Sequence, residues 1–287
     1  MMQAQRTIYL PNMEGSILAF DVGTSALKTA LFTPELELVS LASVAYQART
    51  EGDRVEMEPG DYLGAMKECI CALGMPRKLL AIGITTQGET LIPVGTAGEP
   101  LTRAIVWLDS RAEREAQELS RVLDADVFYQ TTGLPEINGA LPLSKALWLR
   151  QNEPEVFEQT HQLLLLEDYI RLFLTGESAT HASLASSTGW LDVNTGDYWQ
   201  AALDAAGLSR ALLPPIIPSG TRAGSLTTQA ARYLGLRAGV PVFTGAMDQT
   251  AAVLALATRE NAAGETLGTA HVVAASTERP VFDPTKR

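Results

Sequence analysis

The sequence has neither a Walker-type phosphate loop nor the glycine fingerprint of dinucleotide-binding domains. No glycine precedes any of its lysines, and no two glycines are separated by a single residue. Both motifs need closely spaced glycines to bring backbone N–H groups against phosphate oxygens. Their absence excludes these two loops, so nucleotide chemistry in this chain requires a different phosphate-binding element.

Cysteine and histidine are scarce, with two and three residues respectively in a chain of 287. Cys69 and Cys71 lie two apart in a predicted helix, where side chains at that spacing do not face each other, so they can form neither a disulfide nor a metal clamp together. The three histidines show no metal-ligand spacing. This usage predicts reduced thiols in a cytoplasmic protein.

Positive charge is also in short supply, because 22 Lys and Arg stand against 33 Asp and Glu for a net charge of −11. No basic stripe is present to displace the counterions of a nucleic acid, which argues against nucleic-acid binding and against anionic membrane surfaces. No apolar run approaches the length of a membrane span. Residues 1–14 are too weakly apolar for a signal peptide, and we expect them to form a disordered extension.

A content of 46% hydrophobic and 19% charged residues is ample for a sizeable core, in one large or two ordinary domains. Strand-like and helix-like segments alternate along the chain, which predicts an α/β fold. The initial strand–turn–strand, followed by a helix, favours a mixed sheet of the ribonuclease H-like kind. The predicted strands are 17–20, 28–32, 39–46, 79–85, 90–94, 104–108, 163–166 and 239–245, with a hairpin-like piece at 263–275. The main predicted helices are 61–73, 112–122, 142–153, 167–176, 227–234 and 249–257.

The most informative segment is the first hairpin, Ile17–Phe32, whose turn carries Asp21, Gly23, Thr24 and Ser25. Glycine allows tight turn geometry, hydroxyls and N–H groups can bind phosphate oxygens, and a carboxylate can hold hydrated Mg²⁺. On its own, such a turn is also compatible with a purely structural role.

Four segments in order are similar to motifs of the FGGY carbohydrate kinases, which have a two-domain, actin-like fold. The segments are Asp21-Val-Gly-Thr-Ser with Lys28, Gly83-Ile-Thr-Thr-Gln-Gly-Glu-Thr90, Val106-Trp-Leu-Asp-Ser-Arg111 and Gly245-Ala-Met-Asp-Gln249. The resemblance implies an actin-type ATPase domain with a mixed five-stranded sheet and helices on both faces. It also implies a kinase domain at 15–245, and a truncated beginning of a second, ATP-binding domain at 246–287.

The resemblance further implies ATP and Mg²⁺ as cofactors and assigns roles to matching residues. Asp21 would organise the metal, with Gly23, Thr24, Ser25 and Lys28 near the transferred phosphoryl group. A second phosphate loop would contain Gly268 and Thr269. Asp248 would be the general base, although an Asp at that position can also cap the following helix. The residues implied to line the sugar pocket are Gln87, Glu89, Trp107 and Asp109.

The substrate implied is a sugar or sugar alcohol, with a pentulose such as xylulose favoured. Gly88 stands where glycerol kinases carry arginine, and we expect it to leave space for something larger than a triol. Two alternatives stay open at this point: a non-catalytic nucleotide switch of the actin or chaperone type, and a sugar-binding regulator. A homodimer is a further open possibility. Because the chain holds little of the adenosine site, we expect it to turn over ATP poorly alone.

Overall fold

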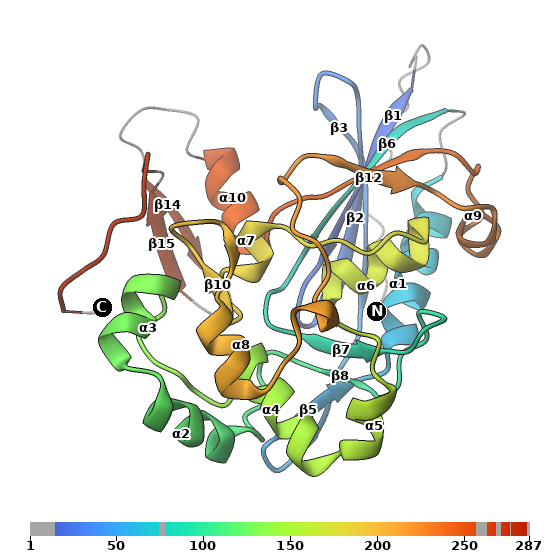
Figure 1. The fold of residues 1–287 in the computed structure, drawn as a ribbon. Helices are drawn as coiled ribbons and strands as arrows, with labels where there is room; N and C mark the ends of the chain where they lie inside the picture. The colour runs from blue at the N-terminus through green and yellow to red at the C-terminus, as the bar shows by residue number, and fades with distance from the viewer. Residues whose placement is uncertain (1–14, 75–77, 257–262, 268–270, 276, 286–287) are drawn as a thin grey trace.

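The computed structural model describes residues 15–74, 78–256, 263–267, 271–275 and 277–285, which form two larger sheets, two small hairpins and the helices around them (Figure 1). The extension predicted at residues 1–14 lies outside the described residues. So do Gly268 and Thr269, the two residues predicted to form a second phosphate loop.

The central sheet has six strands in the order β12-β13-β6-β1-β2-β3. Its strands are β1 (Ser16–Val22), β2 (Ala26–Phe32), β3 (Leu38–Ala45), β6 (Leu79–Thr86), β12 (Arg222–Ser225) and β13 (Pro241–Phe243). β1 pairs in parallel with β6, and β6 with β13, while the β1–β2, β2–β3 and β12–β13 pairs are antiparallel. The predicted mixed α/β sheet is confirmed, with one strand more than expected because short β12 extends its edge.

The three parallel strands bring distant parts of the sequence to one edge of this sheet. Val22 of β1 pairs with Thr86 of β6, and Thr86 in turn forms a parallel bridge with Met247, which follows β13. Carboxyl ends of parallel strands meet at the same edge, which is where α/β proteins place their ligands. Asp21, Gln87 and Asp248 therefore lie close together at the carboxyl edge of the sheet.

Three helices cover one face of the central sheet: α1 (Pro59–Leu73), α6 (Leu166–Thr175) and α9 (Thr228–Leu234). Alternate residues of β1, including Phe20, are buried against them, whereas the residues between, including Ile17, are partly exposed on the opposite face. Period-two alternation of burial along a strand is the expected result of one-sided covering.

The second sheet has five strands in the order β4-β5-β8-β7-β9, joined by antiparallel pairs. Its strands are β4 (Arg49–Glu51), β5 (Arg54–Met57), β7 (Leu91–Val94), β8 (Ala104–Ile105) and β9 (Gln162–Leu165). A second apolar core forms between this sheet and helices α2 (Glu113–Val122), α4 (Pro142–Asn152) and α8 (Gln200–Ala206). Other residues of this sheet, including Val55, Ile92 and Leu164, pack into the same apolar core as the central sheet.

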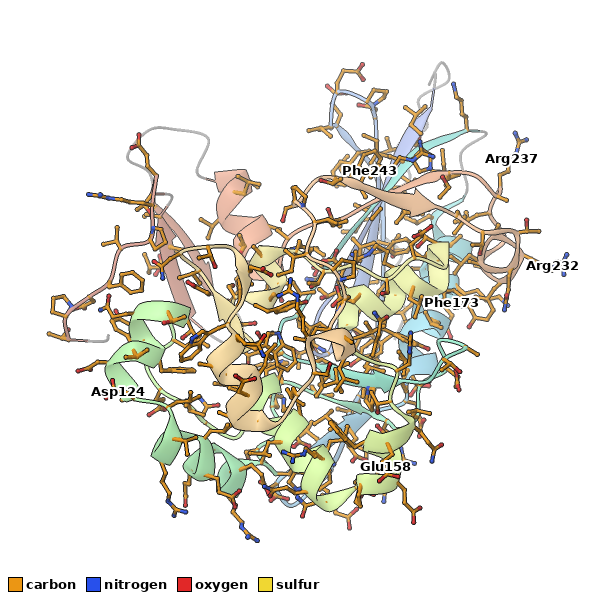
Figure 2. The ribbon with its side chains drawn as sticks, in the orientation of Figure 1. Asp124, Glu158, Phe173, Arg232, Arg237 and Phe243 are labelled. Atoms are coloured by element: carbon orange, nitrogen blue, oxygen red, sulfur yellow. The ribbon has the colours of Figure 1, made fainter. Side chains whose placement is uncertain are left out.

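The remaining elements are short, and several have recognisable ends. α3 begins after Asp124, whose carboxylate accepts two backbone N–H groups, and α6 ends at Gly176 in the left-handed conformation. Charged side chains such as Asp124, Glu158 and Arg232 project from the periphery (Figure 2). The other short elements are α3 (Ala125–Thr132), α5 (Pro154–Gln159), α7 (Ala182–Ala185), β10 (Leu191–Asp192), β11 (Asp197–Tyr198) and the 3-10 turn Arg210–Leu212.

The chain ends with helix α10 (Asp248–Leu256), strand β14 (Ala263–Leu267) and strand β15 (His271–Ala275). β14 and β15 form an antiparallel hairpin that packs on α10. Of the helices in the described part of the chain, none combines the length and apolar character needed to cross a membrane.

Candidate active site

The hairpin between β1 and β2 presents its polar side chains to solvent. Asp21 lies opposite Lys28 in the strand register, and the Lys28 ammonium donates to Asp21 Oδ2 over 3.4 Å. The Gly23 N–H donates to Ala26 O over 3.1 Å and closes the turn. A Cβ on Gly23 would lie 3.3 Å from that same carbonyl, so the turn favours glycine.

Two aromatic side chains fix the hairpin from the inside. The Trp107 indole N–H donates to Thr24 Oγ1 over 2.8 Å, and the Tyr46 hydroxyl donates to Gly23 O over 2.6 Å. Because the Thr24 oxygen accepts from Trp107, its own hydroxyl hydrogen remains available for another acceptor. Ser25 is exposed at the tip of the same turn. A residue predicted to line a sugar pocket thus contacts a residue predicted to lie near phosphate.

Gln87 follows β6 and is buried, with its amide held on one side only. Its backbone N–H donates to Val22 O over 3.0 Å, and its Nε2 donates to the Tyr62 hydroxyl over 3.4 Å. Its Oε1 is buried and accepts no hydrogen bond from the described residues. Burying an amide oxygen without a hydrogen-bond donor costs free energy. A ligand hydroxyl that donates to this oxygen would remove that cost.

Glu89, two residues further on, has a strained backbone and a half-buried carboxyl. Its φ of 62° lies in the left-handed region, which non-glycine residues rarely adopt and which is enriched at functional sites. Burial raises the pKa of the Glu89 carboxyl to about 7, and the positive charge of Lys145 opposes that rise. This carboxyl can therefore change protonation near neutral pH.

Asp109, which the sequence predicts to contact substrate, is held by protein donors in the structure. It is fully buried, its Oδ2 accepts from the Val55 N–H over 2.6 Å, and both oxygens bind Arg111. Arg111 also donates to Glu56 over 2.7 Å and its guanidinium lies 5.0 Å from the Trp148 ring centroid. The geometry gives Asp109 a structural role, because its acceptor positions are occupied by protein donors.

Gly88 does not leave open space, which corrects the prediction from sequence. A Cβ at this position would lie 2.8 Å from Met247 Sδ and 3.0 Å from Ser187 Oγ. The position that a Cβ would take at Gly88 is therefore already in close contact with side chains from later in the chain. Gly88 carries no argument for a larger substrate.

Asp248 is the first residue of α10, and its Oδ1 accepts from the Gln249 N–H over 2.7 Å. Burial raises the pKa of its carboxyl and the negative charge of Asp21 raises it further, whereas the Gln249 bond and the charge of Lys28 lower it. The structure thus brings Asp248 within electrostatic reach of Asp21 and Lys28 on the hairpin. An acidic residue in the first turn also suits the positive end of a helix, so both predicted readings of Asp248 remain compatible.

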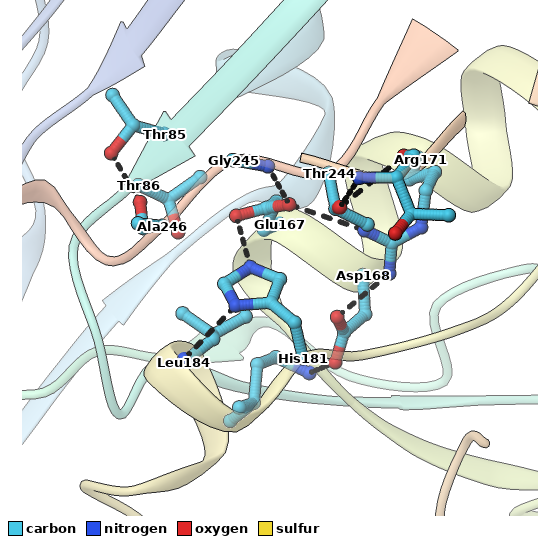
Figure 3. A network of polar contacts seen from close by, with 12 residues as sticks. Thr85, Thr86, Glu167, Asp168, Arg171, His181, Leu184, Thr244, Gly245 and Ala246 are labelled. Atoms are coloured by element: carbon cyan, nitrogen blue, oxygen red, sulfur yellow. Dashed lines mark hydrogen bonds and ion pairs between the residues drawn. The ribbon is translucent and has the colours of Figure 1, made fainter. Parts of the chain in front are cut away.

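A buried polar network holds the segment that leads into Asp248 (Figure 3). Glu167 Oε1 accepts from the Gly245 N–H and from Arg171, each over 3.2 Å, and its Oε2 lies 2.9 Å from His181 Nε2. His181 Nδ1 accepts from the Leu184 N–H over 3.2 Å, so Nε2 carries the hydrogen that binds Glu167. Glu167 therefore joins α6, α7 and the residue three positions before Asp248.

Further hydrogen bonds hold the same segment from two other directions. The Met247 N–H donates to Ser183 Oγ over 3.2 Å, and the Thr85 hydroxyl donates to Ala246 O over 2.5 Å. Gly245 packs so closely on β6 that a Cβ there would overlap Ile84 O. The backbone before Asp248 is thus fixed by elements on either side of it.

Three residues that support the site lie outside the four motifs and were not predicted from the sequence: Lys145, Glu167 and Tyr62. Lys145 interrupts an apolar helical run, and Glu167 opens a largely apolar helix. Charged residues at such positions are seldom fully buried unless paired, so they signal a buried polar interaction. Within the described residues, no cluster of three or more His, Cys, Asp or Glu side chains is arranged to hold a metal ion.

The carboxyl edge, the Asp-Gly-Thr hairpin and the helix that begins at Asp248 define a ribonuclease H-like domain of the actin type. Residues 16–255 match the N-terminal domain of the FGGY family of carbohydrate kinases. The chain therefore belongs to this family, as the four motifs indicated.

Individual relatives share the same region. The chain is 30% identical over 266 residues to a xylulose kinase of Lactococcus lactis subsp. lactis, covering 90% of this chain and 53% of that protein. It is 28% identical over 280 residues to an autoinducer-2 kinase of Escherichia coli, covering 93% and 52%. The solved structure of ligand-bound xylulose kinase from Lactobacillus acidophilus superposes with a TM-score of 0.87 at 28% identity, covering 95% and 56%. The chain spans about half the length of these relatives.

Proposed function

We propose that this protein transfers the γ-phosphoryl group of ATP to a hydroxyl of a sugar or sugar alcohol. The observation that carries this proposal is the meeting of Asp21, Gln87 and Asp248 at the carboxyl edge of the central sheet. One acidic side chain lies on an exposed phosphate-type hairpin, and a second begins a helix beside a pocket with an unpartnered amide. In-line phosphoryl transfer needs these elements side by side.

The substrate side of the site consists of Gln87, Glu89 and Trp107. The buried Gln87 Oε1 lacks a donor, and a substrate hydroxyl would supply one. Glu89 would accept from a second hydroxyl, and the Trp107 ring would form a wall. Asp109 supports this side indirectly by fixing Arg111. A pocket of unpaired hydrogen-bonding groups penalises a molecule that lacks the matching hydroxyl.

Asp248 would act as the general base. A carboxylate accepts the proton of the attacking hydroxyl as the new oxygen–phosphorus bond forms, and ADP leaves with the electrons of the broken bond. Burial raises the pKa of the Asp248 carboxyl, which makes its carboxylate form a stronger base. The hydrogen bonds that fix Gly245 and Met247 would hold this carboxylate in place.

The nucleotide side fits a hydrated Mg²⁺, because this ion keeps several waters and takes only one or two protein carboxylates. Asp21 offers one half-exposed carboxylate at the strand end. The ion would neutralise phosphate charge, and Thr24, Ser25 and Lys28 would bind phosphate oxygens. Gly268 and Thr269 are proposed to add a second phosphate contact. We assign residues 15–245 to the sugar-binding domain and 246–287 to the beginning of an ATP-binding domain.

A pentulose is the proposed substrate class. The names of similar proteins support this proposal, whereas the space beside Gly88 does not. Two of the similar proteins described above are xylulose kinases, whereas the third acts on autoinducer-2. All three names denote kinases of small polyhydroxylated or related molecules. The substrate within this class is left to experiment.

The test is a phosphorylation assay with ATP, Mg²⁺ and single sugars, in which sugar phosphate is detected by mass spectrometry after long incubation. We expect one sugar to be phosphorylated. Asp248→Ala should lower the rate by about 10²–10⁴-fold. Calorimetry should show unchanged sugar binding in that variant. Equal rates for both proteins would refute the role of Asp248. Sugar binding without phosphate transfer in any condition would favour a sugar-binding regulator instead.

A further inference from the structure

Lys145 is a fully buried lysine in the first turn of α4. Its ammonium donates to Val106 O over 2.9 Å and to Glu89 O over 3.3 Å. These two carbonyls belong to segments far apart in the sequence, one after β6 and one after β8. A buried ammonium needs such partners, because its removal from water is otherwise very unfavourable.

Both carbonyls lie in backbone segments that carry residues of the proposed substrate side, Glu89 and Trp107. Val106 directly precedes Trp107, so the first bond fixes the strand end that carries the indole. Glu89 has the left-handed backbone described above, so the second bond holds a carbonyl in an otherwise unfavourable orientation. One side chain therefore connects the two segments that line the substrate side.

The charges around Lys145 come from three residues: Glu89, Asp109 and Arg111. Burial lowers the pKa of the Lys145 ammonium to about 7, while the negative charges of Asp109 and Glu89 oppose that fall. Asp109 already binds Arg111 through both oxygens. For Glu89, by contrast, Lys145 is the cation among the described residues whose charge acts on the carboxyl.

We propose that Lys145 is a positioning residue of the substrate pocket, which joins the Glu89 turn to the Trp107 segment and supplies the positive charge that the Glu89 side chain faces. The inference rests on the proposed function only in calling the pocket a substrate pocket. Its consequence is chemical: Lys145 favours the carboxylate form of Glu89, which accepts hydrogen bonds from hydroxyl groups and donates none. Sugar binding should therefore strengthen as the pH rises through the pKa of Glu89.

The first test measures the pKa of Glu89 by NMR of protein labelled with ¹³C at the glutamate carboxyl, without any sugar. The Glu89 signal is assigned by its loss in Glu89→Gln. Lys145→Met should raise this pKa by about one pH unit or more, since an opposite charge nearby lowers a carboxyl pKa by that order. Ser144→Ala is the control, because it removes a neighbouring buried hydroxyl that has no partner in the structure. It should leave the pKa unchanged, and an unchanged pKa in Lys145→Met would overturn the proposal.

A second variant covers the case in which Lys145→Met does not fold. In Glu89→Gln the substituted side chain is only half-buried, so the fold should tolerate it. Loss of the Glu89 charge should lower the pKa of Lys145 further, read from its ¹³Cε shift. An unchanged Lys145 signal in Glu89→Gln would contradict the proposed pairing as directly as an unchanged Glu89 pKa in Lys145→Met.

Sugar binding then separates this inference from the proposed function. If a sugar binds, its pH profile should move to higher pH in Lys145→Met and flatten in Glu89→Gln. A shifted Glu89 pKa with no sugar bound by the parent protein would uphold the pairing and refute the substrate assignment. A bound sugar with an unmoved pH profile would refute the proposed role of Lys145 in binding.

Discussion

The two sides of the site differ in how firmly the protein holds them. On the hairpin, Lys28 and Asp21 are 58% and 39% exposed, and their atoms lie 3.4 Å apart. Around the pocket and the Asp248 segment, Gln87, Lys145 and Glu167 are buried and bonded to several elements. Buried partners fix geometry before a ligand arrives, whereas exposed side chains must be ordered by the ligand.

This difference suggests a division of labour. The proposed substrate side is organised in advance, which would favour discrimination between closely related hydroxylated molecules. The proposed phosphate side keeps its side chains exposed, so that they could rearrange around a nucleotide and its metal ion. The Trp107–Thr24 hydrogen bond is a direct link between the two sides.

The largest effect on stability is expected from the buried network before Asp248. Glu167→Gln removes the charge that faces Arg171, and both side chains are fully buried. The free energy of unfolding should fall by about 3 kcal/mol in urea denaturation, because a buried charge loses a partner. Glu118→Gln is a matched control, since Glu118 also pairs with an arginine four residues away but on an exposed surface. It should show no measurable change, and equal effects in the two variants would show that the buried network before Asp248 is held no more firmly than an exposed ion pair.

A smaller effect is expected where the two sides meet. Trp107→Phe keeps an aromatic wall but removes the indole N–H that binds Thr24. A cycle with Thr24→Val should give a coupling energy of about 1 kcal/mol in unfolding experiments, the usual value of one hydrogen bond. Additive effects of the two substitutions would show that the hydrogen bond does not link the hairpin to the pocket.

The smallest effect is expected on the exposed side. Lys28→Met removes an ion pair that water screens, so the melting temperature should not change measurably. The same substitution should weaken phosphate-dependent binding of ATP, measured by calorimetry. A clear loss of thermal stability would mean that the hairpin is held as firmly as the pocket.

The sequence allowed the prediction of the hairpin, the mixed α/β sheet and the family, because these depend on local pattern and on motif order. It did not reveal that Met247 lies beside Gly88, or that the Val55 N–H binds Asp109 Oδ2. These contacts join segments distant in sequence, and single-chain periodicity carries no information on them. Lys145 was visible as a charge in an apolar helix, but its two carbonyl partners depend on how the sheets pack.

The most direct test of the account is a thermal-shift screen of this chain, without nucleotide, against pentuloses, hexuloses, pentitols, erythritol and glycerol. A ligand that binds only the folded state raises the melting temperature. The account predicts that one sugar, expected among the pentuloses, raises it while the others do not, because the substrate side is organised within this chain. A cooperative melt that no sugar shifts would contradict the claim that these residues form a prearranged sugar pocket.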